Sequence, residues 1–275
     1  MYKRIVVKIG TNLLADKVHG INTARVLEIA KVLSGLEKSG KDICLVTSGA
    51  IGAGVAALKL KEKPKTIPEK QATAAIGQPL LMEAYENAFR KYGVVIGQIL
   101  LTKDDFTDKK RYLNAKNTFA VLLGKRVVPI VNENDTVAVD EIKVGDNDNI
   151  SAMVAHLTGA DLLIILSDIK GLCKEDPNEN AGAELIPLVK KITPAIEKLA
   201  KSSKGGLSTG GMTTKLQAAK KCAAAGITMV IADGKDPSVI KSIVAGEPRG
   251  TVFLPCNNKL TDHEIWKLMH GNASK

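Results

Sequence analysis

Residues 5–12 read Ile5-Val6-Val7-Lys8-Ile9-Gly10-Thr11-Asn12, an apolar run that ends at a glycine. Such a run is typical of a strand covered on both faces of a sheet, and Lys8 interrupts it near the carboxyl end. Burying an ammonium group costs several kcal/mol unless an anion meets it. Open α/β sheets bind ligands at this end of their strands, so Lys8 is a candidate binding residue. The alternative is a lysine that snorkels from the strand end to water.

Apolar runs and helical periodicity alternate along the rest of the chain. Strands are predicted at residues 5–9, 43–47, 94–101, 127–132, 162–168 and 227–231. Helices are predicted at residues 22–38, 68–91, 111–123, 149–157, 213–225 and 237–244. Gly40 should cap the first helix, and Pro79 should break or kink the second. Strands that alternate with helices pair in parallel, so the predicted fold class is α/β, a three-layer αβα sandwich with a mostly parallel central sheet.

Two polar stretches are predicted to be loops. Residues 175–182 carry turn-forming residues and are expected to form a surface loop or hairpin. Residues 201–211, rich in Ser, Gly and Lys, are expected to form a flexible loop that leads into a helix.

The composition indicates a globular enzyme of the cytoplasm. The chain is 45% hydrophobic and 25% charged, which is ordinary for a soluble protein. No apolar run approaches the roughly 20 residues that cross a bilayer, and the N-terminus begins directly in a strand, leaving no room for a signal peptide. The four scattered cysteines indicate reduced thiols rather than disulfides. The four histidines form no HExxH cluster, which argues against a zinc mechanism.

The net charge of +10 points to an anionic partner. Nucleic acid, acidic lipid and a small anionic substrate all fit a basic chain. The lysines are spread along the sequence, however, and aromatics at 3% supply no stacking platform for bases. A positive field that attracts phosphates and carboxylates is therefore the preferred interpretation, without nucleic acid or membrane as a partner.

A glycine-rich segment, residues 46–54 (VTSGAIGAG), follows the second predicted strand. Glycines let backbone N–H groups approach an anion, and a helix that starts here would add its positive N-terminal end. The segment also fits a permissive GxGxxA dinucleotide pattern, but it starts too far past the strand for that motif. The alternative role for these glycines is tight packing of a helix on the sheet.

A cluster rich in carboxylates and amides follows the fourth predicted strand. It comprises residues 132–135 (NEND) and residues 145–149 (GDNDN). The second segment fails the EF-hand pattern, since Ile150 takes the fifth position and no glycine takes the sixth. Asp148 or Asn149 could cap the helix that follows, yet two such clusters exceed what capping needs.

Two further segments are candidate parts of a site. Residues 166–172 (LSDIKGL) end the fifth strand, and residues 208–216 (STGGMTTKL) precede a helix. The second segment is not a Walker A loop, because no Gly-Lys-Ser/Thr is present. It offers the same tools nonetheless: glycines that fit phosphate, hydroxyls that donate hydrogen bonds, and Lys215 just inside a helix start.

Together these segments resemble the amino acid kinase family, in particular its glutamate-phosphorylating branch. The matching strings are residues 7–12, 46–54, 132–135, 145–148, 166–168 and 209–215, in one continuous order over about residues 3–255. The resemblance implies that ATP, with Mg²⁺, phosphorylates the γ-carboxylate of L-glutamate in the first step of proline synthesis. The alternatives are a kinase for another small anionic metabolite and a non-catalytic regulator that binds nucleotide or amino acid.

The resemblance also implies a role for each matching residue. Lys8 and Lys215 would lie on the transferred phosphoryl group, and Asp148 would orient both lysines. Glutamate would be bound by Ser48, Gly49, Asp135 and Asn147, with Asp135 on the α-ammonium. The nucleotide would be bound by Lys8, Gly10, Ser167, Asp168, Thr209, Gly210, Gly211, Met212, Thr213, Thr214 and Lys215. No protein metal site is implied, because phosphates and water can hold Mg²⁺.

The resemblance extends to organisation and partners. Residues 1–255 are expected to form the kinase domain, and the tail of residues 256–275 is too short for the C-terminal PUA domain of many relatives. Family members are usually oligomeric, so a homo-oligomer is expected. Feedback inhibition by L-proline and transfer of the product to glutamyl phosphate reductase are further expectations.

Overall fold

The apolar run around Lys8 forms β1 (Arg4–Ile9), a central strand of an eight-stranded sheet. The computed structural model describes residues 2–16, 20–138, 147–176, 179–180, 182–202, 211–256 and 264. The strand order is β5-β6-β4-β1-β7-β9-β10-β8. The strands are β4 (Asp42–Val46), β5 (Ile96–Leu101), β6 (Val128–Glu133), β7 (Leu162–Ser167), β8 (Leu188–Val189), β9 (Thr228–Asp233) and β10 (Thr251–Phe253).

The predicted mostly parallel sheet is confirmed. β1 pairs in parallel with β4 on one side and with β7 on the other. The one reversal among the described pairings of this sheet is β10, which runs antiparallel to β9. The chain builds one half of the sheet from β1 through β4 to β5 and then returns to β7, so the strand order switches direction at β1. Ligands bind at such a switch point in open α/β sheets.

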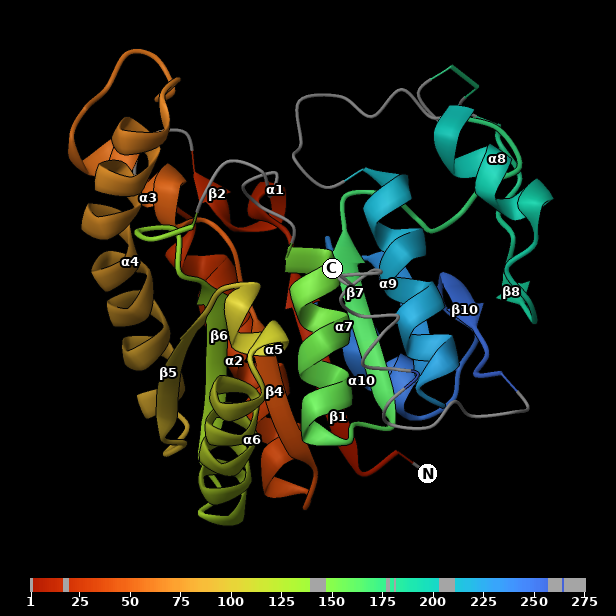
Figure 1. Cartoon of the computed structure of the whole chain (residues 1–275), viewed down its shortest axis with the longest axis horizontal. Helices are drawn as coiled ribbons and strands as arrows, with labels where there is room; N and C mark the ends of the chain where they lie inside the picture. Colours follow the sequence, from red (N-terminus) through yellow and green to blue (C-terminus); the bar gives the residue numbers. More distant parts are fainter. Residues whose placement is uncertain are drawn as a thin grey trace.

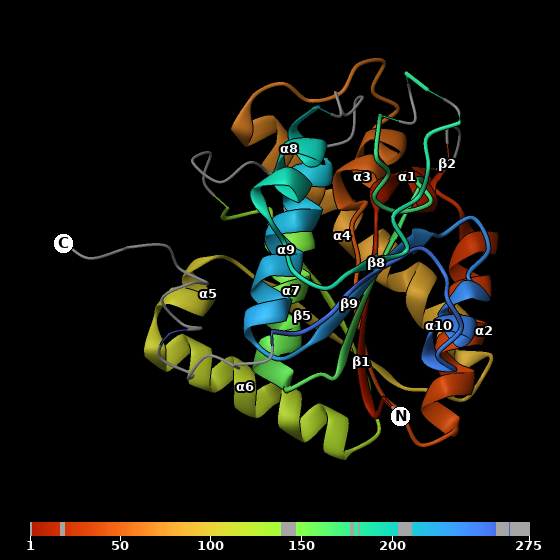
Figure 2. The same cartoon turned by 90° about the vertical axis from the view of Figure 1, so that its right-hand side faces the viewer.

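Two helical layers cover the sheet, as predicted, and Figure 2 shows the strands between them. One layer contains α5 (Asp104–Thr107), α6 (Lys109–Gly124), α7 (Asn147–Thr158), α8 (Pro194–Ser202) and α9 (Met212–Ala224). The other contains α1 (Thr11–Leu14), α2 (Thr23–Lys38), α3 (Ala50–Ala57), α4 (Ile67–Arg90) and α10 (Val239–Val244). A short hairpin, β2 (Ala15–Asp16) with β3 (Gly20–Ile21), connects α1 to α2. In the described part of the chain no helix is both long and apolar enough to span a membrane.

The alternation of side chains along β1 determines which side of the sheet Lys8 faces. Ile5, Val7 and Ile9 pack into the core under α2 and α4, whereas Val6 packs into the core under α7 and α9. Alternate residues of a strand face opposite sides, so Lys8 faces the same side as Val6, toward α7 and α9.

Most predicted elements are present, and the differences have local causes. Gly40 follows α2 with φ of +89°, as expected of a helix C-cap. Of the two predicted effects of Pro79, the break is wrong, because α4 runs without interruption from Ile67 to Arg90, whereas the kink stays a prediction. Strands β8 and β10 were not predicted, since two and three residues carry too little periodic signal.

The two predicted loops have different outcomes. An antiparallel bridge joins Cys173 to Leu185 on either side of residues 175–182, which confirms the loop or hairpin; residues 177–178 and 181 lie outside the described residues. The loop predicted at residues 201–211 falls largely on residues 203–210, which lie outside the described residues.

Two glycines allow α3 and α4 to touch. A Cβ on Gly77 of α4 would collide with the carbonyl oxygen of Ala50, and one on Gly54 of α3 would collide with that of Thr73. The alternative role given above for the glycine-rich segment was tight packing of a helix on the sheet. Gly54 does serve close packing, but it packs against helix α4 and not against the sheet.

We expect Gly77→Ala to lower the free energy of unfolding by about 1–3 kcal/mol, because the helices must separate to admit the methyl group. Urea unfolding measures the change. The control is Gly35→Ala in α2, where an added Cβ meets nothing within 4 Å. That variant should gain up to ~1 kcal/mol from better helix propensity. Equal stability of the two variants would contradict the packing role.

Candidate active site

Three helix starts and one strand end meet at the carboxyl edge of the sheet. Lys8 lies near the end of β1, and α3 and α7 begin at the same edge because they follow β4 and β6, which end there. The start of α9, which follows α8 in the chain, lies at this edge as well, since Thr214 and Lys215 contact Asp148 of α7. Figure 1 shows α7 and α9 side by side over β1 and β7. Helix N-termini carry partial positive charge, so this edge favours anions even before side chains are counted.

Asp148 joins the two predicted lysines. Lys8 Nζ lies 2.6 Å from Asp148 Oδ1, and Lys215 Nζ lies 3.2 Å from Asp148 Oδ2. Thr214 donates its hydroxyl to Asp148 Oδ2 at 2.7 Å. Lys8, Lys215 and Asp148 are only 6%, 4% and 1% exposed, so Lys8 does not snorkel to water. Residues from β1, α7 and α9 thus converge on one buried carboxylate.

The electrostatics of this triad favour an added anion. Burial disfavours the charged carboxylate, but the ammonium groups of Lys8 and Lys215 outweigh it and lower the pKa of Asp148 to about 2. Burial lowers the pKa of Lys215, and repulsion from Lys8 adds to this, against the attraction of Asp148. One carboxylate is therefore shared by two ammonium groups. A phosphate placed beside Lys8 and Lys215 would stabilise the charged form of both lysines.

The structure also brings together two of the residues predicted to bind glutamate. Asn147, at the start of α7, donates from Nδ2 to Ser48 Oγ at 2.8 Å, although 99 positions separate them. Gly49 adopts a φ of +111°, which a residue with a side chain rarely adopts, and it caps α3 at its N-terminus. The backbone turns at Gly49 so that the start of α3 lies beside Ser48.

Two further residues of this region were not predicted as site residues from the sequence. Asn132 of β6 accepts a second bond from Asn147 Nδ2 at 3.2 Å. Gln78 of α4 accepts a bond from Asn132 Nδ2 at 2.8 Å. Asn132 belongs to one of the segments that match the family, but no role was assigned to it. Nothing in the sequence around Gln78 indicates a function, because a single glutamine in a helix is common.

Asp135 lies half-buried in the turn after β6. Burial, with repulsion from Glu133, raises the pKa of Asp135 to about 7. A carboxyl group with this pKa is partly protonated at neutral pH, and its charge depends on what approaches it.

We expect the KM for an amino-acid substrate to depend on pH through Asp135. The raised pKa means that the group is neutral below about pH 7, where it attracts an ammonium group poorly. At saturating nucleotide the KM for that substrate should therefore rise up to roughly tenfold per unit as pH falls from 7 to 5.5. Initial rates measure this profile. Asp135→Asn should raise the KM and flatten the profile, and an unchanged slope in this variant would contradict the assignment.

The predicted nucleotide residues are described in part. Ser167 donates to Asp168 at 3.1 Å, and Asn12 donates to the other oxygen of Asp168 at 2.8 Å. These contacts keep the pKa of Asp168 low despite its partial burial. Asn12 was not predicted as a site residue, and its bond links α1, which follows β1, to the segment after β7.

The remaining predicted nucleotide residues that the structure describes lie at the starts of α1 and α9. Gly10 is the N-cap of α1, and Gly211 is the N-cap of α9. Met212, Thr213, Thr214 and Lys215 form the first turn of α9. Thr209 and Gly210 lie outside the described residues.

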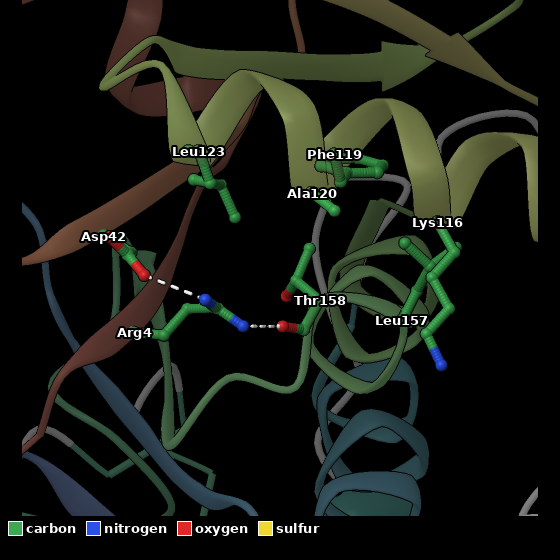
Figure 3. A pocket seen from close by; sticks show the side chains of 9 residues that line it. Arg4, Asp42, Lys116, Phe119, Ala120, Leu123, Leu157 and Thr158 are labelled. Atoms are coloured by element: carbon green, nitrogen blue, oxygen red, sulfur yellow. Dashed lines mark hydrogen bonds and ion pairs between the residues drawn. The ribbon is translucent and has the colours of Figure 1, made fainter.

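A cavity of about 300 Å³ lies at the opposite edge of the sheet, where β1 and β4 begin (Figure 3). Two of its charged groups are paired: Arg4 contacts Asp42 at 2.9 Å and also donates to the carbonyl oxygen of Thr158. Buried Phe119 and Leu157 form part of its wall. The shared carboxylate and the helix starts make the carboxyl edge the better candidate for chemistry.

Comparison with known proteins agrees with this geometry. The family model described as Amino acid kinase family matches residues 3–233. The chain belongs to the amino acid kinase family. UMP kinase from Bacillus anthracis superposes with a TM-score of 0.62 at 14% identity, covering 94% of this chain and 98% of that one. At this identity the likeness concerns the fold alone, which is the amino acid kinase fold that the sequence predicted.

Relatives of higher identity lie within the same family. A glutamate 5-kinase of Thermoanaerobacter sp. (strain X514) is 48% identical over 271 residues, covering 98% of this chain and 73% of the relative. A glutamate 5-kinase of Clostridium tetani is 52% identical over 251 residues, covering 91% of this chain and 94% of the relative.

Proposed function

We propose that this chain is a kinase that transfers the γ-phosphoryl group of ATP to the γ-carboxylate of L-glutamate. The product is L-glutamyl 5-phosphate, the first intermediate of proline biosynthesis. The observation that carries the proposal is the buried carboxylate of Asp148, shared by Lys8 and Lys215 at 2.6 and 3.2 Å. The glutamate 5-kinases that match nearly the whole chain support the choice of substrate.

The reaction needs positioning and charge compensation rather than a protein nucleophile. Both reactants are anions, and the attacking oxygen must come within ~3 Å of the phosphorus. Lys8 and Lys215 offset the repulsion, and they do so in a site from which water is largely excluded. A general base is not needed, because a γ-carboxylate is already ionised at neutral pH.

Each residue near the triad takes a role that fits its chemistry. Asp135 attracts the α-ammonium of glutamate, and Ser48 with the N–H groups near Gly49 binds carboxylate. The nucleotide lies along Gly10, Ser167, Asp168 and residues 209–215. Asp148 orients the two lysines and does not itself react.

Mg²⁺ accompanies the nucleotide in this proposal. Among the residues that the structure describes, no three His, Cys, Asp or Glu side chains are grouped as metal ligands. Phosphate oxygens and water, which are the usual ligands of Mg²⁺ in nucleotide sites, would hold the ion. Its chemistry there is to neutralise charge on the phosphates.

Three further expectations belong to the same proposal. L-proline, an amino acid with the same α-carboxylate and an α-ammonium, would inhibit by competing for the glutamate site. The enzyme would work as a homo-oligomer. A glutamyl phosphate reductase would consume the product, because an acyl phosphate is too labile to accumulate.

The experiment is an ADP-release assay with ATP, Mg²⁺ and L-glutamate, in which hydroxylamine traps the acyl phosphate as a hydroxamate. Turnover with L-glutamate well above that with L-aspartate or UMP is the expected result. Turnover with another anion alone would identify a different kinase of this family. ATP binding without ADP release for any acceptor would identify a regulator. Either outcome would overturn the proposal.

A further inference from the structure

A row of side-chain hydrogen bonds runs from α4 to the candidate glutamate site. Asn132 Nδ2 donates to Gln78 Oε1 at 2.8 Å, and Asn147 Nδ2 donates to Asn132 Oδ1 at 3.2 Å. The same Asn147 nitrogen donates to Ser48 Oγ at 2.8 Å. Gln78, Asn132 and Asn147 are 8%, 2% and 3% exposed, whereas Ser48 is half-buried and accessible. The row therefore lies behind the residue that a substrate would touch.

The row has a direction. Asn147 Nδ2 donates one of its hydrogens to Ser48 and the other to Asn132. The Ser48 hydroxyl oxygen is therefore an acceptor on the side that faces the protein interior. Its own hydrogen is then free to point outward, toward a carboxylate oxygen of a ligand. If the three amides were reversed, Asn147 Oδ1 would face Ser48 and consume that hydrogen. Ser48 would then present only lone pairs, which suit an ammonium group and repel a carboxylate.

The row is not built for stability alone. Buried polar atoms that stabilise a fold are almost always paired. Gln78 Nε2 and Asn147 Oδ1, however, have no hydrogen-bond partner in the described part of the chain. A polar network with two unpaired buried atoms is less stable than apolar packing of the same shape. Its presence at this place is better explained by what it does to Ser48.

We propose that Gln78 is a positioning residue for the substrate. Its Oε1 fixes the orientation of the Asn132 amide, which fixes that of Asn147, and the row thereby makes Ser48 a hydrogen-bond donor to a substrate carboxylate. This inference rests on the proposed function, since it takes the ligand at Ser48 to be L-glutamate. Gln78 acts through Ser48 and does not itself contact the reacting atoms.

The test is a double-mutant cycle between Gln78→Met and Ser48→Ala, read as KM and kcat for L-glutamate and KM for ATP. Met has the shape of Gln without its hydrogen-bonding groups. Gln78→Met should raise the KM for L-glutamate roughly fivefold to tenfold, the size of one lost hydrogen bond, with kcat and the KM for ATP changed less than twofold. In the Ser48→Ala background the same change should have almost no further effect.

Two controls keep the result interpretable. Gln98→Met makes the same exchange at an exposed position of β5 and should change none of these constants. Asn132→Leu breaks the row at its middle and should reproduce the pattern of Gln78→Met, including its loss in the Ser48→Ala background. Should Gln78→Met fail to fold in thermal unfolding, the Asn132→Leu cycle carries the test.

The outcomes separate the two proposals. A wild-type enzyme without glutamate turnover would overturn the proposed function itself. Two results from an active enzyme would overturn the positioning role alone. One is that Gln78→Met raises the KM for L-glutamate equally in the wild-type and Ser48→Ala backgrounds, and the other is that it raises the KM for ATP as much as that for L-glutamate. A purely structural effect would be additive with Ser48→Ala and would not distinguish the two substrates.

Discussion

Replacing Lys8 with Met should lower kcat about 100- to 1000-fold, the usual cost of removing one preorganised charge donor from a transition state. The KM for L-glutamate should change only a few-fold, because the charge that Lys8 meets grows as the phosphoryl group is transferred. Steady-state rates with both substrates measure the split. The control is Lys91→Met, an exposed lysine after α4, which should behave as wild type. Near-normal turnover in Lys8→Met would contradict its role.

The same variant should remain folded. Removing Lys8 leaves Asp148 paired with Lys215 at 3.2 Å, a one-to-one ion pair in place of a shared carboxylate. The free energy of unfolding should therefore stay equal to that of wild type or rise. This separates a loss of chemistry from a loss of structure.

Replacing Asp148 with Asn should have the opposite effect on stability. The variant keeps the shape of the side chain but leaves two buried ammonium groups without their shared carboxylate. Breaking a buried ion pair from one side typically costs about 3–5 kcal/mol in the free energy of unfolding, and a loss of that size is expected here. Denaturant unfolding measures it. The control is Glu62→Gln, which removes an exposed ion pair with Lys65 and should cost less than about 1 kcal/mol.

A polyanion should restore part of the lost stability. Tripolyphosphate supplies the negative charge that Asp148→Asn lacks, so it should raise the melting temperature of this variant more than that of wild type. Sodium chloride at equal ionic strength controls for screening. A loss of stability as small as that of Glu62→Gln would contradict the shared-carboxylate arrangement, and so would an equal gain from tripolyphosphate in both proteins.

The sequence was sufficient for the layers and for the lysines because both rest on strong local signals. An unbroken apolar run, which indicates a strand buried on both faces, identifies β1. The polar segments that come directly after predicted strands lie at one edge of the sheet, because parallel strands end at the same edge. Lys8 and Lys215, separated by 207 positions, were predicted to share a site only through the family resemblance, and the structure gives them the common partner Asp148.

The sequence was insufficient where a contact depends on three-dimensional packing. A break of the helix at Pro79 was one of two expected effects, and it does not occur: α4 continues through Pro79, next to the close contact of Gly77 with Ala50 of α3. Gln78 carries no local signal, since its role depends on the neighbouring amide of Asn132. Strands β8 and β10 are too short to show an alternating pattern; β10 pairs with the edge of β9, and β8 pairs with β10.

A crystal structure with ADP, L-glutamate, Mg²⁺ and aluminium fluoride is the most direct test of the convergence of Lys8 and Lys215. The fluoride stands in for the phosphoryl group during transfer. Both Nζ atoms should lie within about 3.2 Å of its ligands or of the bridging oxygens. A complex in which either nitrogen keeps only its contact with Asp148, and faces no part of the transferred group, would contradict the proposed mechanism.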